Sequence, residues 1–171
     1  MRDGFAGTSM ADIIGEADSS AGSVYSNFEN KSELVRYAAS RALRDLNATV
    51  AEELPSERTP ASVLAHLLES SDDRAHAQTL LQIWAEVPRA PELAEIGRQS
   101  VLELRAFVQA ALLPWCRDRA HSDTTAPDAA ADALADAVLT AVQGYLVRIT
   151  LDRDVDTKML ATRIVEVFAH L

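Results

Sequence analysis

The sequence of 171 residues contains a single cysteine, Cys116. One thiol makes no intramolecular disulfide and no thiolate cluster for a metal ion, which fits the reducing cytoplasm. Aromatic residues make up only 5% of the chain, whereas alanine, leucine and valine supply most of its 48% hydrophobic residues. This composition favours packed helices over sheets. We therefore expect an all-α, cytoplasmic protein.

The sequence also lacks the motifs of common enzymes and metal sites. It has no G-x-S-x-G motif and no glycine-rich phosphate loop. No apolar run reaches the ~20 residues that a membrane-spanning helix needs, and we recognise no signal peptide. We expect no enzyme, no cofactor, no metal and no membrane location. Four histidines lack a partner at metal-ligand spacing on one helix face: His66, His76, His121 and His170.

Positive charge is scarce, because 16 Lys and Arg face 26 Asp and Glu, a net charge of −10. Phosphate binding draws on Lys and Arg, so this balance alone argues against a nucleic-acid partner. Residues 1–45 share the deficit, with five basic residues against seven acidic ones, a net charge of −2. Net charge governs solubility and association rate more than fold, so a specific motif outweighs it.

Such a motif is present in residues 8–31, where the pattern predicts a helix, a brief turn and a second helix. Thr8 and Ser9 can each cap the first helix. The Asp18–Ser19 pair interrupts it, since both side chains compete for backbone hydrogen bonds, and Ser20 can cap the second helix. This arrangement is a helix-turn-helix, whose second helix enters the DNA major groove. The apolar residues of the first helix recur at helical spacing: Met10, Ile13, Ile14 and Ala17.

The second helix has an inner and an outer face. Val24 and Phe28 lie four residues apart and can anchor it inward. The hydroxyl of Tyr25 can reach a phosphate, and Lys31, capped by Asn30, would be a second phosphate contact. Spacing alone fits an ordinary helical hairpin packed into a core equally well. The outward positions are Ala21, Gly22, Ser23 and Tyr25.

These residues, in this order, resemble the DNA-binding region of the TetR family of bacterial transcriptional repressors. The resemblance covers about the first fifth of the chain. It implies a dimeric repressor that leaves its double-stranded DNA operator when a small-molecule effector binds the C-terminal domain. The matching positions are Gly4, Phe5, Thr8, Ser9, Met10, Asp12, Ile13, Ser20, Gly22, Tyr25, Phe28, Lys31 and Leu34. The implied phosphate contacts are Thr8, Ser9, Tyr25 and Lys31. The implied groove-facing positions are Ser20, Ala21, Gly22 and Ser23.

Two departures from the family pattern stand out. Asp18–Ser19 replaces the usual Gly-Val of the turn, which removes an apolar contact. Family members also carry a complete helix before the Gly-Phe pair, where this sequence has only residues 1–3. Without that helix, apolar side chains of the head remain exposed to water, at a free-energy cost of ~25 cal/mol per Å² of exposed apolar surface. Either the gene start is assigned too late, or the chain is a shortened, dimeric ligand-binding or dominant-negative regulator that cannot bind DNA.

The remaining sequence predicts further helices. A long one should run from Lys31 to about Glu53, so we place a helix-turn-helix domain at 1–48 and a ligand-binding and dimerisation domain at 49–171. Pro114 should kink or stop the helix in which it lies. The other expected helices are Ala61–Ser70, Arg74–Val87, Leu93 to about Leu113, Pro127 to about Leu151, and Thr157–Leu171.

By the resemblance, the last two helices, 127–151 and 157–171, pair with their copies across a two-fold axis in a homodimer. The same pattern would also close the core of a monomer. An effector pocket should be mostly apolar with a few polar groups, and Trp84 and Tyr145 are its best candidates. Arg148, if it points inward, favours an acidic ligand. The full candidate set is His66, Gln82, Trp84, Phe107, Trp115, Tyr145 and Arg148.

Overall fold

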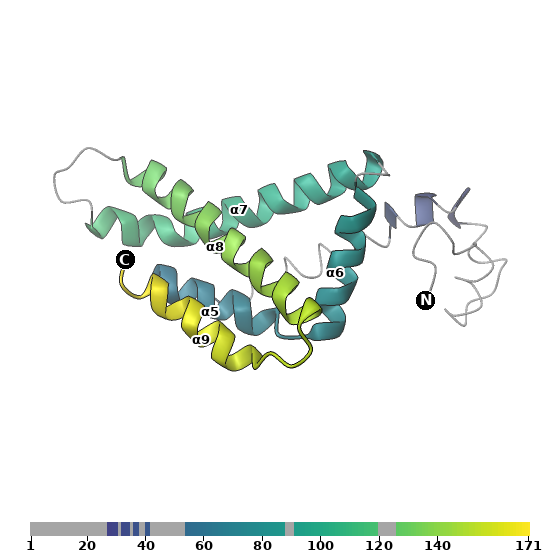
Figure 1. Ribbon diagram of the computed structural model, residues 1–171. Helices are drawn as coiled ribbons and strands as arrows, with labels where there is room; N and C mark the ends of the chain where they lie inside the picture. The colour runs from purple at the N-terminus through teal and green to yellow at the C-terminus, as the bar shows by residue number, and fades with distance from the viewer. Residues whose placement is uncertain are drawn as a thin grey trace.

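A computed structural model shows the protein as a set of packed helices (Figure 1). It describes residues 27–30, 32–34, 36–37, 40–41, 54–87, 91–119 and 126–171. Within these ranges every regular element is a helix, so the predicted all-α class is confirmed. The helices of the body are α5 (Pro60–Ser70), α6 (Arg74–Glu86), α7 (Pro91–Arg119), α8 (Pro127–Leu151) and α9 (Thr157–Phe168).

Side-chain caps fix where three of these helices begin. The Thr59 hydroxyl accepts the backbone N–H of Ser62 at 3.1 Å, and the Ser62 hydroxyl accepts that of Thr59 at 2.9 Å, which is a capping box ahead of Pro60. Asp73 accepts the N–H of Ala75 at 2.9 Å at the start of α6. Asp156 does the same for Met159 at the start of α9. Each cap satisfies a backbone donor that the first helical turn leaves open.

Helix α7 differs from its predicted bounds, because it continues through Pro114 to Arg119. The prediction that the helix ends near Leu113 is therefore wrong. Proline removes one hydrogen bond to the carbonyl of Ala110, but both residues lie on the exposed side, where water can reach that carbonyl. Leu112 and Cys116 on the other side are buried and keep the helix packed across the break.

The last helix is shorter than predicted, since α9 ends at Phe168 and not at Leu171. Ala169, His170 and Leu171 are exposed, so no packing extends the helix. The predicted long helix of residues 31–53 lies mostly outside the described residues, which include only short helical pieces of it.

Helix α8 lies at the centre of the body and packs against α5, α6, α7 and α9. Helices α5 and α9 lie side by side along one flank of α8, and α7 covers another (Figure 1). Tyr145 of α8 and Leu64 of α5 are among the largest side chains that are fully buried. The buried side of α8 consists of Ala131, Ala135, Val138, Leu139, Val142, Tyr145, Leu146 and Ile149.

By length and composition α8 is long and apolar enough to cross a membrane, with a mean hydropathy of 1.3 over its best window. The central helix of a water-soluble protein passes the same test, and 39% of this window is buried within the protein. The four helical neighbours of α8 account for the apolar residues on its buried side.

Leu112→Ala tests the packing of α7. Leu112 is fully buried, so its truncation should lower the free energy of unfolding by about 2–5 kcal/mol. Leu102→Ala on the same helix is the control, because Leu102 is 43% exposed and its loss should cost about 0.5 kcal/mol or less. Urea denaturation followed by circular dichroism measures both. Equal losses would contradict the described orientation of α7.

Candidate functional site

The described part of the N-terminal head centres on the start of a helix after Asn30. The Asn30 Oδ1 atom accepts the N–H of Glu33 at 2.9 Å, and a Glu33 carboxylate oxygen accepts the N–H of Glu29 at 2.7 Å. The Leu34 N–H reaches the Asn30 carbonyl at 3.3 Å. Asn30 therefore caps this helix as the sequence predicts, and Lys31 follows the cap directly.

The predicted DNA contacts themselves lie outside the described residues. The structure consequently leaves them as predictions from the sequence. They are Thr8, Ser9, Ser20, Ala21, Gly22, Ser23, Tyr25 and Lys31.

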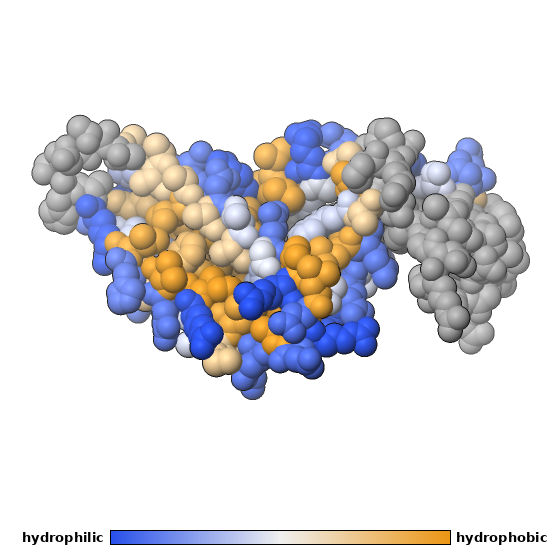
Figure 2. All heavy atoms as spheres, in the orientation of Figure 1, coloured by the Kyte–Doolittle hydropathy of each residue, from blue (hydrophilic) through white to orange (hydrophobic). Residues whose placement is uncertain are grey.

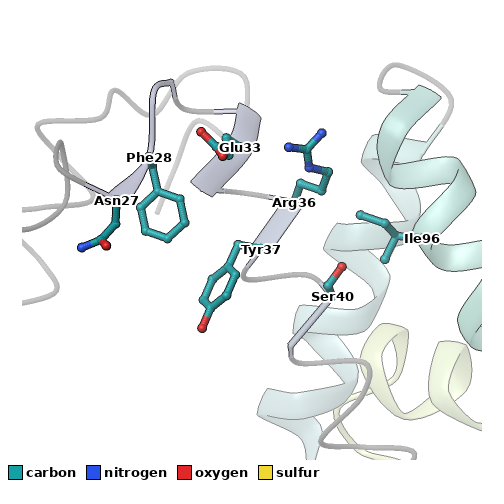
Figure 3. A pocket seen from close by; sticks show the side chains of 7 residues that line it. All are labelled: Asn27, Phe28, Glu33, Arg36, Tyr37, Ser40 and Ile96. Atoms are coloured by element: carbon teal, nitrogen blue, oxygen red, sulfur yellow. The ribbon is translucent and has the colours of Figure 1, made fainter.

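A hollow of about 720 Å³ separates the described head residues from α7 (Figure 3). On the head side the rings of Phe28 and Tyr37 form a tilted pair, with centroids 5.4 Å apart. Ile96 of α7 supplies the opposite wall. Head and body therefore meet along a loosely filled seam, which the sequence does not predict. Its lining is Asn27, Phe28, Glu33, Arg36, Tyr37, Ser40 and Ile96.

Tyr145, a predicted effector contact, points inward but already has a partner. It is 1% exposed, and its hydroxyl donates a hydrogen bond to a carboxylate oxygen of Asp72 at 2.7 Å. Burial raises the pKa of Tyr145 above its usual range, and the bond to Asp72 raises it further. The phenol is therefore held neutral and ties α8 to the turn between α5 and α6.

The other predicted pocket residues are spread over four helices. Trp84 and Phe107 pack against the edge of the core. Trp115 is half-buried, with the Arg119 guanidinium 4.4 Å from its ring centre and its buried indole N–H without a hydrogen-bond partner in the structure. The structure does not gather the seven residues into one described cavity. His66 is half-buried, whereas Gln82 and Arg148 are exposed.

One stripe on the exposed side of α8 consists of small and apolar residues together with one threonine. These six residues follow spacings of four and three, a pattern typical of helix-helix seams. A Cβ atom at Gly144 would meet no atom within 4 Å in the part of the chain that the structure describes. Figure 2 shows apolar and pale residues gathered over α8 and α9. We name this stripe the outer apolar face, and it comprises Ala133, Ala137, Thr140, Gly144, Val147 and Leu151 of α8. On the neighbouring α9, Met159 and Val167 are also exposed.

An ion-pair cluster joins α7 to α8 beside this face. The Arg105 guanidinium contacts a carboxylate oxygen of Asp132 at 2.7 Å and binds both carboxylate oxygens of Asp136. The bond from Arg105 holds the pKa of Asp136 below its usual range. Because these groups are open to solvent, the cluster orients the two helices more than it stabilises them.

The family follows from the head. Residues 1–38 match the family model described as bacterial regulatory proteins, tetR family. The N-terminal part of the chain therefore matches the DNA-binding region of the TetR family. The predicted resemblance of these residues to TetR-family regulators of transcription is confirmed. Proteins of this family are generally not enzymes.

Solved structures share the fold of this chain over nearly its whole length. A transcriptional regulator from Pseudomonas aeruginosa PAO1 is 20% identical with a TM-score of 0.74, covering 99% of this chain and 82% of that one. GusR of Salmonella enterica is 22% identical with a TM-score of 0.67, covering 98% and 88%. FadR from Bacillus subtilis in complex with stearoyl-CoA is 14% identical with a TM-score of 0.68, covering 97% and 89%. A comparison with curated proteins gives no match.

Tyr145→Phe tests the buried hydroxyl. Asp72 is exposed and can turn to water, so the lost bond should lower the free energy of unfolding near pH 7 by about 0.5–1.5 kcal/mol. Above about pH 10 the unfolded chain releases the phenol proton and the folded chain keeps it, so the wild type should lose stability as the pH rises.

The variant lacks this titration, and its alkaline decline should be shallower. Urea denaturation between pH 7 and 11 measures the difference, with Tyr37→Phe as the control because Tyr37 is 49% exposed. An identical alkaline decline in wild type and Tyr145→Phe would refute the assignment.

Proposed function

We propose that this TetR-family regulator is a ligand-responsive repressor. Two copies bind a double-stranded DNA operator and release it when a small molecule binds the C-terminal domain. The observation that carries the proposal is the family match of residues 1–38, joined to a helical body whose fold is shared with solved transcriptional regulators. The proposed domains are residues 1–48, which read DNA, and residues 49–171, which bind the effector and the second copy.

The head is proposed to use the eight residues predicted from the sequence. Thr8, Ser9, Tyr25 and Lys31 would contact phosphates, and residues 20–23 would face the bases. The small side chains of residues 20–23 allow the backbone to approach the groove closely. Phosphate contacts position the protein, and base contacts specify the sequence.

The outer apolar face is proposed as the dimer surface. Isolated copies rarely leave a continuous apolar face to water, and a second copy related by a two-fold axis would cover it with the same residues. Small residues such as Ala137 and Gly144 permit close helix packing. The four helices that meet would be α8 and α9 of each copy.

The effector site is proposed among the predicted pocket residues that the structure leaves at the edge of the core. Trp84 and Phe107 offer apolar surface there, and His66 is half-buried. Tyr145 would contact a ligand only after its hydrogen bond to Asp72 is broken. Gln82 and Arg148 are exposed, so they would contact only a part of the ligand that lies near solvent. The solved FadR relative holds an acyl-CoA, so a ligand with a long apolar part is a reasonable first probe.

Ala137→Arg tests the dimer surface. Ala137 lies on the outer apolar face, and a cation there would be buried without a partner at the seam. The variant should remain folded and weaken the dimer at least about tenfold, a free-energy change of about 1.4 kcal/mol. Ala106→Arg, at an exposed alanine of α7, is the matched control. Analytical ultracentrifugation measures both, and equal dimer affinities would move the interface elsewhere.

Lys31→Gln tests the head. With the DNA upstream of the chain's own gene as probe, mobility-shift assays should show weaker binding, and the slope of log affinity against log salt should fall in magnitude by about 0.9. Arg117→Gln, at an exposed site on α7, should leave both quantities unchanged. A wild-type protein that dimerises but binds no DNA at low salt would favour the alternative of a dimeric regulator without DNA binding.

A further inference from the structure

Arg74, the first residue of α6, holds the end of α8. One guanidinium nitrogen, Nη1, donates to the Ile149 carbonyl at 2.7 Å and to the Asp152 carbonyl at 3.1 Å. The other, Nη2, donates to the Val155 carbonyl at 3.0 Å. One side chain therefore joins α6 to the last turn of α8 and to the connection that leads into α9.

A second contact holds α8 one turn earlier. Tyr145 lies four residues before Ile149 on the same side of the helix, and its hydroxyl donates to Asp72 at 2.7 Å. Asp72 lies in the short connection between α5 and α6, and Arg74 begins α6. Two successive turns of α8 are thus fixed by one three-residue segment, and Figure 1 shows these elements meeting at one corner of the body.

The chemistry of a helix end explains why arginine suits this place. The last carbonyls of a helix lack intrahelical donors and carry the negative end of the helix dipole. A planar guanidinium has five N–H donors in a fixed fork, so it can satisfy several carbonyls together. Lysine presents a smaller cation that cannot span the same three acceptors in this geometry.

The same turns of α8 carry part of the outer apolar face. Val147 is 37% exposed and Leu151 is 79% exposed, and both alternate along the helix with the held residues Tyr145 and Ile149. Any movement of the Arg74 guanidinium with α6 would therefore shift residues that face the proposed second copy. At its other end α6 leads toward α7, whose Ile96 faces the head across the hollow.

We infer that Arg74 is a positioning residue that couples the placement of α6 to the dimer surface of α8 and α9. This inference rests on the proposed dimer. Without the guanidinium, the last turn of α8 and the α8–α9 connection lose three hydrogen bonds, and the surface presented to the partner is no longer held in one arrangement.

The test measures local opening and self-association in the full chain. In Arg74→Gln, amide hydrogen exchange of residues 149–157 should be at least tenfold faster, and the dimer dissociation constant at least tenfold larger. For Arg74→Lys both quantities should lie between those of Arg74→Gln and the wild type. This variant also provides the test if Arg74→Gln does not fold. Arg98→Gln, which removes a guanidinium from an exposed pair with Glu95 on α7, should change neither quantity.

A control variant with a similar loss of stability distinguishes the proposed coupling by Arg74 from a general destabilisation of the protein. Leu93→Ala trims a buried side chain at the start of α7 and should lower the melting temperature without changing the dimer dissociation constant. Equal dimer constants for Arg74→Gln, Arg74→Lys and the wild type would overturn the inference. A wild type that stays monomeric would refute the proposed dimer and with it the coupling, whereas unchanged exchange at 149–157 in a dimer would refute the role of Arg74 alone.

Discussion

The burial of α8 is the constraint on which the rest of the body depends. Its inner side packs against four other helices and includes the phenol of Tyr145, which a nonpolar core accepts only because Asp72 binds its hydroxyl. The hydrophobic effect drives this packing and turns the apolar side of α8 inward. The directional bonds of Tyr145 to Asp72 and of Arg74 to the end of α8 then hold two turns of the helix at fixed points.

Much of the helical body follows from the sequence, because helix starts carry local chemistry. The helices expected to begin at Ala61 and Thr157 are present, with α5 beginning one residue earlier at Pro60, and α8 ends at Leu151 as predicted. The prediction that Pro114 ends its helix near Leu113 is wrong. The rule for proline considers only the hydrogen bond that proline removes, and not the burial of Leu112 and Cys116, which lie on either side of it in the sequence. Rules based on one residue omit its packing, whereas in the folded protein the packing of neighbouring residues can keep a helix intact across a proline.

The candidate site is less accessible to such rules. That Tyr145 points inward is predictable from the apolar stripe of α8, but its bond to Asp72 spans 73 residues and leaves no local trace in the sequence. The acceptors of Arg74 are backbone carbonyls, which every residue carries, so no side-chain pattern could reveal them. The predicted DNA contacts show the opposite case, because the family motif predicts them from the sequence alone.

Gly144 on the outer apolar face is a residue that does not favour the helix in which it lies. Glycine in the middle of a helix is less favourable than alanine by about 1 kcal/mol, and among the described residues nothing stands close enough to forbid the extra methyl group. For a solitary chain, alanine would therefore be the better residue, and the glycine is a local weakness in its central helix. In the proposed dimer the missing methyl group would let the second copy approach α8 closely, so the stability of one copy and the shape of its surface place different demands on this position.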